Sequence, residues 1–265
     1  MIEKTLETES GNIRYWISGE IRPDRLSLLF LHGLTASHQL FEQQLGHFSD
    51  RYNVITWDAP AHGLSRPFKD FTYEKAANAL IRILDELGIA EAVFIGQSMG
   101  GFITQSVLKR APERVKAFVS LDSTPFGEKY YSKSDRWWLR QVEWMSRLYP
   151  EKALKKAIAK QTAREERARR NMEDMLSVYE KNELCHLMGI GFAGFLEDNC
   201  DLQISCPTLL IVGEFDITGR VKQYNEQWAK ELNTSVKWVK DAAHNSNDDQ
   251  PEQVNRLIEE FLSGL

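Results

Sequence analysis

The stretch Val93–Gly101, with the sequence VFIGQSMGG, decides the fold of this chain of 265 residues. It opens with a short apolar run typical of a buried strand, and Ser98 follows directly, flanked by Gly96 and Gly100. A helical pattern then begins and runs through residues 102–107. Glycines on either side of a serine allow a sharp turn from strand to helix, because side chains there would collide with neighbouring backbone. The stretch therefore predicts a strand–turn–helix unit that presents the Ser98 hydroxyl at the end of a strand.

Strand and helix patterns alternate on both sides of this unit. Helical spacing of apolar residues is found in residues 76–87 and 221–232, and a last helix follows Pro251. The expected strands are residues 12–17, 26–31, 52–57, 93–95, 115–121, 208–212 and 235–239. Such alternation predicts an α/β fold with a mostly parallel sheet flanked by helices. In a sheet of this kind, functional residues lie at the carboxyl ends of the strands.

One long segment interrupts the alternation. Residues 125–203 contain no strand pattern, and they hold several tryptophans, a charged Ala-rich stretch and an apolar piece. We therefore expect a helical cap, or lid, over residues 125–203. The α/β core would then consist of residues 1–124 together with residues 204–265.

Composition narrows the class of protein. Hydrophobic residues make up 42% and charged residues 27% of the chain, which is ordinary for a globular protein and excludes general disorder or a collagen-like repeat. The net charge of −5 gives no reason to expect a nucleic-acid partner. No apolar run approaches the roughly 18 residues that span a bilayer, and the polar start, MIEKTLETES, lacks the apolar segment of a signal peptide. We expect a cytoplasmic protein with no membrane partner.

The three cysteines fit this expectation. Cys185, Cys200 and Cys206 cannot all pair with one another, and their spacing matches no CxxC pattern. The sequence therefore predicts reduced thiols and no metal site.

Polar side chains follow the expected strands, and three of them form a chemically meaningful set. A serine hydroxyl becomes a good nucleophile only when a base takes its proton, and that base is commonly a histidine oriented by a carboxylate. His244 follows the last expected strand and precedes the last helix, so a loop can bring it to Ser98. For the carboxylate, the chain order favours Asp216, with Asp122 as the alternative.

A serine nucleophile also needs hydrogen-bond donors for the oxyanion that forms on attack. One donor is expected to be the backbone N–H of Met99, directly after the serine. The other is expected from the loop after the first buried strand, at Leu34, with His32 and Gly33 shaping that loop.

Taken together, these motifs resemble the α/β-hydrolase superfamily, in its small, capped branch. The matching segments, in the order typical of that family, are LLFLHGLTAS (28–37), VITWDAPAHGLS (54–65), VFIGQSMGG (93–101), LLIVGEFDIT (209–218) and DAAHNSNDDQPE (241–252). The resemblance implies a core sheet of eight strands with the cap inserted after the sixth. It also supports Ser98, Asp216 and His244 as a catalytic triad, and Leu34 and Met99 as oxyanion donors.

We therefore expect a serine hydrolase that needs no cofactor and cleaves a small-to-medium carboxylic ester or lactone with an apolar part. The expected partner is a small-molecule substrate. Candidate substrate-pocket residues are His32, Gly33, Phe126, Trp137 and Trp138. Alternatives on the same three residues are carbon–carbon bond hydrolysis, thioester cleavage, peptide cleavage by an aminopeptidase, and acyl transfer. A further alternative is a receptor-like relative that binds a ligand without rapid turnover.

Overall fold

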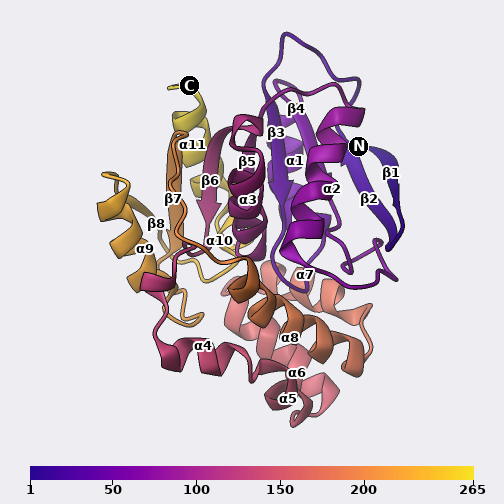
Figure 1. The fold of residues 1–265 in the computed structure, drawn as a ribbon, viewed down its shortest axis with the longest axis vertical. Helices are drawn as coiled ribbons and strands as arrows, with labels where there is room; N and C mark the ends of the chain where they lie inside the picture. Colours follow the sequence, from indigo (N-terminus) through magenta and orange to yellow (C-terminus); the bar gives the residue numbers. More distant parts are fainter.

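The computed structural model describes residues 1–265 and contains an eight-stranded sheet (Figure 1). The strand order across the sheet is β1-β2-β4-β3-β5-β6-β7-β8. The strands are β1 (Ile2–Thr8), β2 (Gly11–Ile17), β3 (Ser27–Leu31), β4 (Asn53–Trp57), β5 (Ala92–Gln97), β6 (Val115–Leu121), β7 (Thr208–Gly213) and β8 (Val236–Val239). The mostly parallel α/β sheet expected from the sequence is therefore confirmed.

Only the first two strands are antiparallel to their neighbours. β1 pairs with β2, and β2 pairs with β4, in antiparallel register, whereas every pair from β4 to β8 is parallel. The residue pattern alone did not predict β1, because of its seven residues only Leu6 is fully buried. An edge strand with one buried side chain leaves almost no alternating apolar signal.

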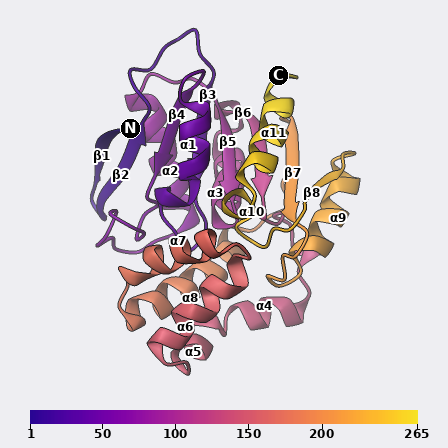
Figure 2. The same ribbon diagram turned by 180° about the vertical axis from the view of Figure 1, so that it is seen from behind.

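Helices cover both faces of the sheet (Figures 1 and 2). One face packs against α2 (Tyr73–Glu86), α3 (Met99–Arg110) and α9 (Val221–Glu231), and the other against α1 (Glu42–Phe48) and α11 (Pro251–Leu262). Alternate side chains of each central strand supply the two cores: Leu29 and Leu31 of β3 face one, while Leu28 and Phe30 face the other. Burial on both faces explains why these strands read as continuous apolar runs.

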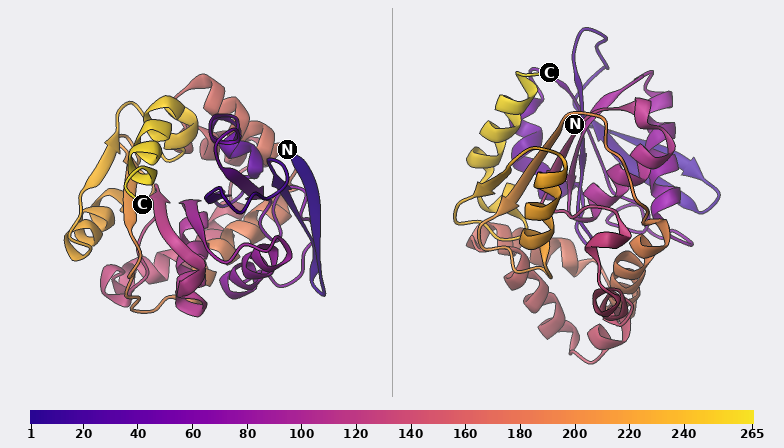
Figure 3. Two further views of the ribbon diagram at one scale, coloured as in Figure 1. Left: turned by 90° about the horizontal axis from the view of Figure 1, so that it is seen from above. Right: turned by 60° about the vertical axis from the view of Figure 1, so that its left-hand side comes forward.

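The segment 125–203, between β6 and β7, consists of helices joined by loops and contains no strand. We call it the helical insertion; its helices are α4 (Lys133–Leu139), α5 (Val142–Arg147), α6 (Glu151–Thr162), α7 (Glu166–Ser177) and α8 (Lys181–Asp198). It lies beyond one end of the sheet, on the side away from the carboxyl terminus of the chain (Figure 3). The helical insertion expected after the sixth strand is therefore present.

The end of the insertion is anchored on α3. Asp198, the last residue of α8, accepts hydrogen bonds from Lys109 and Arg110, at 2.9 and 2.8 Å, and also contacts the hydroxyl of Ser106. The insertion thus returns to α3, the helix that directly follows Ser98. None of the helices combines the length and the apolar character that crossing a bilayer requires.

Candidate active site

Ser98 occupies a strained turn between β5 and α3. Its φ of 49° and ψ of −112° are unusual for a residue with a side chain, and such strain is typical of functional positions. The flanking glycines make the turn possible: a Cβ on Gly96 would lie 2.5 Å from backbone atoms of Gly100, and a Cβ on Gly100 would lie 2.0 Å from the carbonyl oxygen of Leu31. The structure therefore has the sharp strand–turn–helix unit that the sequence predicts.

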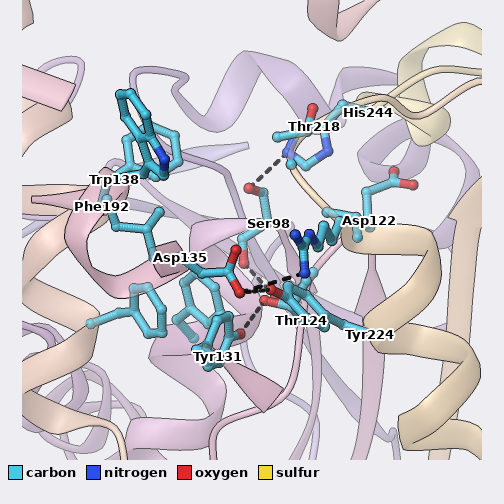
Figure 4. A pocket seen from close by; sticks show the side chains of 17 residues that line it. Ser98, Asp122, Thr124, Tyr131, Asp135, Trp138, Phe192, Thr218, Tyr224 and His244 are labelled. Atoms are coloured by element: carbon cyan, nitrogen blue, oxygen red, sulfur yellow. Dashed lines mark hydrogen bonds and ion pairs between the residues drawn. The ribbon is translucent and has the colours of Figure 1, made fainter. Parts of the chain in front are cut away.

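The hydroxyl of Ser98 lies at the end of a chain of hydrogen bonds, of which Figure 4 shows the one to His244. Its Oγ is 2.8 Å from Nε2 of His244, and Nδ1 of the same ring is 2.7 Å from Oδ2 of Asp216. The other carboxylate oxygen, Oδ1, accepts a hydrogen bond from the backbone N–H of Thr218 at 2.8 Å. Three residues separated by 118 and 28 positions in the chain are thus brought into contact in the order that the sequence predicts.

The buried carboxylate governs the protonation of the imidazole. The carboxylate of Asp216 accepts a hydrogen bond from Nδ1–H of His244, which leaves the lone pair of Nε2 facing Ser98. Burial works to lower the pKa of His244, but the charge and the hydrogen bond of Asp216 outweigh it, so the pKa lies above the ordinary value of 6.5. The imidazole is therefore a stronger base than a free histidine.

Asp122, the alternative acid, makes no hydrogen bond to His244. Its Oδ1 accepts the N–H of Gly213 at 2.7 Å, and its Oδ2 accepts the N–H and the hydroxyl of Ser246 at 3.1 and 2.6 Å. It therefore joins the end of β7 to the loop that follows His244. Burial, together with the nearby charge of Asp216, raises the pKa of Asp122.

The two expected oxyanion donors both lie beside Ser98. Leu34 and Met99 line the same small cavity as the serine. Met99 is the first residue of α3, so its N–H has no acceptor within the helix, and the N–H of Leu34 donates to no other group of the protein. A Cβ on Gly33 would lie 2.0 Å from Oε1 of Gln97, which shows how closely this loop approaches the turn at Ser98.

Two cavities meet at Ser98 and His244. The larger, about 220 Å³, lies beneath α4, and the smaller, about 120 Å³, lies beneath α6 to α8. Phe102, Phe192 and Thr218 line both. The larger cavity is additionally lined by Tyr131, Trp138, Leu139, Phe195, Arg220 and Tyr224, and the smaller by Ile158, Met172 and Met188. A carbonyl held at Ser98 would have space for one substituent on each side.

Of the five expected pocket residues, only Trp138 lines a cavity beside Ser98. His32 is fully buried, and its ring is held by the backbone. Its Nε2 accepts the N–H of Ala59 at 2.9 Å, and its Nδ1 bonds the carbonyl of Gly33 at 2.8 Å. Burial also lowers the pKa of His32 to about 4. His32 and Gly33 therefore form the support of the loop rather than the pocket wall, and here the sequence prediction is wrong.

Phe126 and Trp137 also miss the cavities. Phe126 is buried with its ring 6.0 Å from that of Phe102, which is the side chain that reaches the cavity. Trp137 lines neither cavity, although it is as exposed as Trp138, at 53%. Phe192 is the main wall residue that sequence reasoning missed; its spacing from Met188 and Phe195 places the three on one face of α8, but that helix is apolar nearly all round.

No group of three or more His, Cys, Asp or Glu side chains lies close enough together to hold a metal ion. The three cysteines are all unpaired.

Comparison with known proteins places this chain in a family. The family model described as the alpha/beta hydrolase fold matches residues 27–159, half of the chain. Across 97% of this chain and 96% of the relative, the sequence is 28% identical to 3-oxoadipate enol-lactonase 2 of Acinetobacter baylyi.

Solved structures agree on the fold. An esterase from Thermogutta terrifontis superposes with a TM-score of 0.79 at 20% identity, covering 100% of this chain and 99% of the other. The enol-lactonase from Burkholderia xenovorans LB400 superposes with a TM-score of 0.75 at 20% identity, covering 98% and 100%. The family match and the shared architecture lead to one conclusion: this chain is a member of the α/β-hydrolase family.

Proposed function

We propose that this protein hydrolyses a carboxylic ester or lactone through an acyl-enzyme formed on Ser98. The observation that carries the proposal is the unbroken chain from Ser98 Oγ through His244 to Asp216, at 2.8 and 2.7 Å, opening into two cavities. The full-length similarity to an enol-lactonase supports an ester-type bond, because a lactone is a cyclic ester.

In the first half of the reaction, His244 Nε2 takes the proton of Ser98 while Oγ attacks the carbonyl carbon. The carbonyl π electrons move to oxygen, and the N–H groups of Leu34 and Met99 donate to that oxyanion. The tetrahedral intermediate collapses by breaking the bond to the leaving oxygen, which receives the proton from the imidazolium. In a lactone, the leaving alcohol stays attached to the acyl group.

In the second half, a water molecule cleaves the acyl-enzyme. His244 takes a proton from the water, whose oxygen attacks the acyl-enzyme carbonyl, and the same two amides donate to the new oxyanion. Collapse breaks the bond to Ser98 Oγ, and the imidazolium returns the proton to the serine. Asp216 stays ionised throughout and holds the imidazole in the required tautomer.

The walls of the cavities support the expected substrate class. Six Phe, Tyr and Trp side chains line the larger cavity, and Asp122, Asp135 and Arg220 are its ionisable side chains outside the triad. A pocket of about 220 Å³ suits an apolar group of modest size, and the smaller cavity suits a shorter substituent. We assign the helical insertion, residues 125–203, as the cap that closes both cavities, with residues 1–124 and 204–265 as the core.

The test compares kcat/KM for matched esters, lactones, thioesters, amino-acid amides and a vinylogous 1,5-diketone. Esters or lactones should be the fastest class, and Ser98→Ala should abolish turnover of all of them. Fast cleavage of the diketone, thioesters or amides with only slow turnover of every ester would replace the proposal with the corresponding alternative reaction. No turnover of any class, with tight binding retained, would favour a ligand-binding relative.

A further inference from the structure

The turn between α6 and α7 lies against the loop that carries His244. The backbone N–H groups of Arg164 and Glu165 donate to the carboxylate of Asp249, with the shortest distances 2.9 and 2.8 Å. The same carboxylate accepts the N–H of Ala243 through its Oδ2 at 2.8 Å. Asp249 thus binds the helical insertion with one side and the residue before His244 with the other.

A second bond joins the same parts on the other side of the imidazole. The N–H of Asn245 donates to the carbonyl oxygen of Thr162, the last residue of α6, at 2.7 Å. The residues immediately before and after His244 are therefore both tied to the turn that ends α6.

The turn also reaches the loop of the carboxylate partner. The guanidinium of Arg164 lies 3.8 Å from the centroid of the Phe215 ring, directly before Asp216. Such a contact between a cation and an aromatic face is stabilising. One short turn of the insertion therefore contacts the neighbours of both members of the Asp216–His244 pair.

The environment of Asp249 indicates a carboxylate held for its geometry. Asp249 is only 4% exposed, and its hydrogen bonds all come from backbone N–H groups, with no cationic side chain in contact. The adjacent Asp248 instead pairs with side chains of α7, namely Arg167 and Asn171. Neither acidic residue lines the cavities beside Ser98.

We propose that Asp249 is a positioning residue that fixes the orientation of His244 and couples it to the helical insertion. The proposal rests on the function proposed above, since it assigns Asp249 a part in proton transfer at Ser98. Because Asp249 touches no substrate space, its loss should lower kcat and leave KM unchanged. A misplacement of about 1 Å at a catalytic group costs on the order of 10²-fold in rate.

The experiment compares Asp249→Asn with Asp248→Asn, which breaks bonds to α7 of the helical insertion but leaves the N–H of Ala243 paired. Two quantities are measured: the kcat and KM for the best ester, and the far-downfield proton resonance of the His244 Nδ1–H that bonds Asp216. In Asp249→Asn, the amide NH₂ faces backbone donors, so kcat should fall by about 10²-fold with KM within twofold. The resonance should shift or broaden. Asp248→Asn should leave the kinetic constants and the resonance at their wild-type values within experimental error.

A second variant covers the case in which Asp249→Asn fails to fold. Glu165 has a φ of −69°, which proline adopts, so Glu165→Pro removes one donor to Asp249 without removing the carboxylate. It should change kcat and the resonance in the same direction by a smaller factor.

These measurements distinguish a failure of the positioning role from a failure of the proposed function. A folded Asp249→Asn with kcat within twofold and an unchanged resonance would overturn the proposal, as would a rise in KM at constant kcat. If Asp249→Asn does not fold, an unchanged Glu165→Pro would overturn it. If the wild type hydrolyses no ester, the function proposed above fails, while a shifted resonance in Asp249→Asn still supports the positioning role.

Discussion

Replacing Asp216 with asparagine is predicted to block the base while leaving the site intact. Asparagine has the same size, and its Oδ1 can still accept the N–H of Thr218, now bonded at 2.8 Å. Its NH₂ group then faces Nδ1 of His244, which must accept a hydrogen bond. The ring proton moves to Nε2, the nitrogen that lies 2.8 Å from Ser98 Oγ, and the imidazole can no longer take the serine proton.

The size of the effect follows from this change of tautomer. An aspartate-to-asparagine change in a Ser-His-Asp triad lowers kcat by about 10⁴-fold. That factor corresponds to ~5.4 kcal/mol of transition-state stabilisation. KM should change little, because Asp216 is not among the residues that line either cavity.

The pH profile provides a second readout of the same variant. The neutral imidazole is the active base, so kcat/KM should rise as the pH passes upward through the pKa of His244, which lies above 6.5. Asp216 is the largest contributor that raises this pKa, so the residual activity of Asp216→Asn should show its acid limb at lower pH.

The matched control is Asp122→Asn, a change at the other buried carboxyl group of the site. Asp122 bonds Gly213 and Ser246 rather than the imidazole, so kcat should fall by less than about tenfold. Steady-state kinetics on one chromogenic ester decide between the two carboxyl groups. If Asp216→Asn stays within tenfold of wild type while Asp122→Asn loses about 10⁴-fold, Asp122 is the acid and the reasoning fails.

Three further predictions concern stability and substrate binding. Gly100→Ala should destabilise the fold by about 3 kcal/mol in denaturant unfolding, since its Cβ would lie 2.0 Å from a backbone oxygen of β3. Gly46→Ala, in α1 with open space around it, should instead stabilise the fold by about 1 kcal/mol. A similar loss of stability in Gly100→Ala and Gly46→Ala would contradict the packing argument. Asp198→Asn should cost about 3 kcal/mol at neutral pH, because Lys109 loses its carboxylate partner and Arg110 keeps only the exposed Glu74, at 3.6 Å. Burial works to raise the pKa of Asp198, but its hydrogen bonds hold the pKa at about 2. The difference in unfolding free energy between wild type and Asp198→Asn should therefore disappear as the pH falls from the ordinary carboxyl range toward 2. A difference independent of pH would refute the ion-pair account. Phe192→Ala should raise KM about tenfold with kcat little changed, because Phe192 lines both cavities. A fall in kcat at constant KM would show instead that Phe192 acts on the transition state.

The parts of the site that the sequence predicted are those fixed by local rules. The turn at Ser98 is defined by adjacent glycines, and the structure shows the clashes that exclude any other residue at Gly96 and Gly100. His244 could be located because only one histidine follows the last strand. The choice between Asp216 and Asp122 was harder, since both follow strands, and only the three-dimensional hydrogen bonds show which one reaches the imidazole.

The pocket could not be predicted in the same way, because it depends on how the insertion packs. Trp137 and Trp138 are neighbours in sequence and equally exposed, at 53%, yet only Trp138 lines the larger cavity. His32 stands next to the expected oxyanion loop, but its ring turns inward to bond the backbone at Ala59. The contact of Asp249 with the α6–α7 turn joins residues 84 and 85 positions apart, and no local pattern indicates it.

The most direct test of the proposed chemistry is covalent labelling with a fluorophosphonate, followed by peptide mass spectrometry. Such a reagent reacts with a serine whose proton is taken by a neighbouring base. We predict one adduct on Ser98 in the wild type, none in Ser98→Ala, and much slower labelling in His244→Ala. An unlabelled wild-type protein, or labelling of Ser98 at the same rate without His244, would contradict the claim that the imidazole activates this hydroxyl.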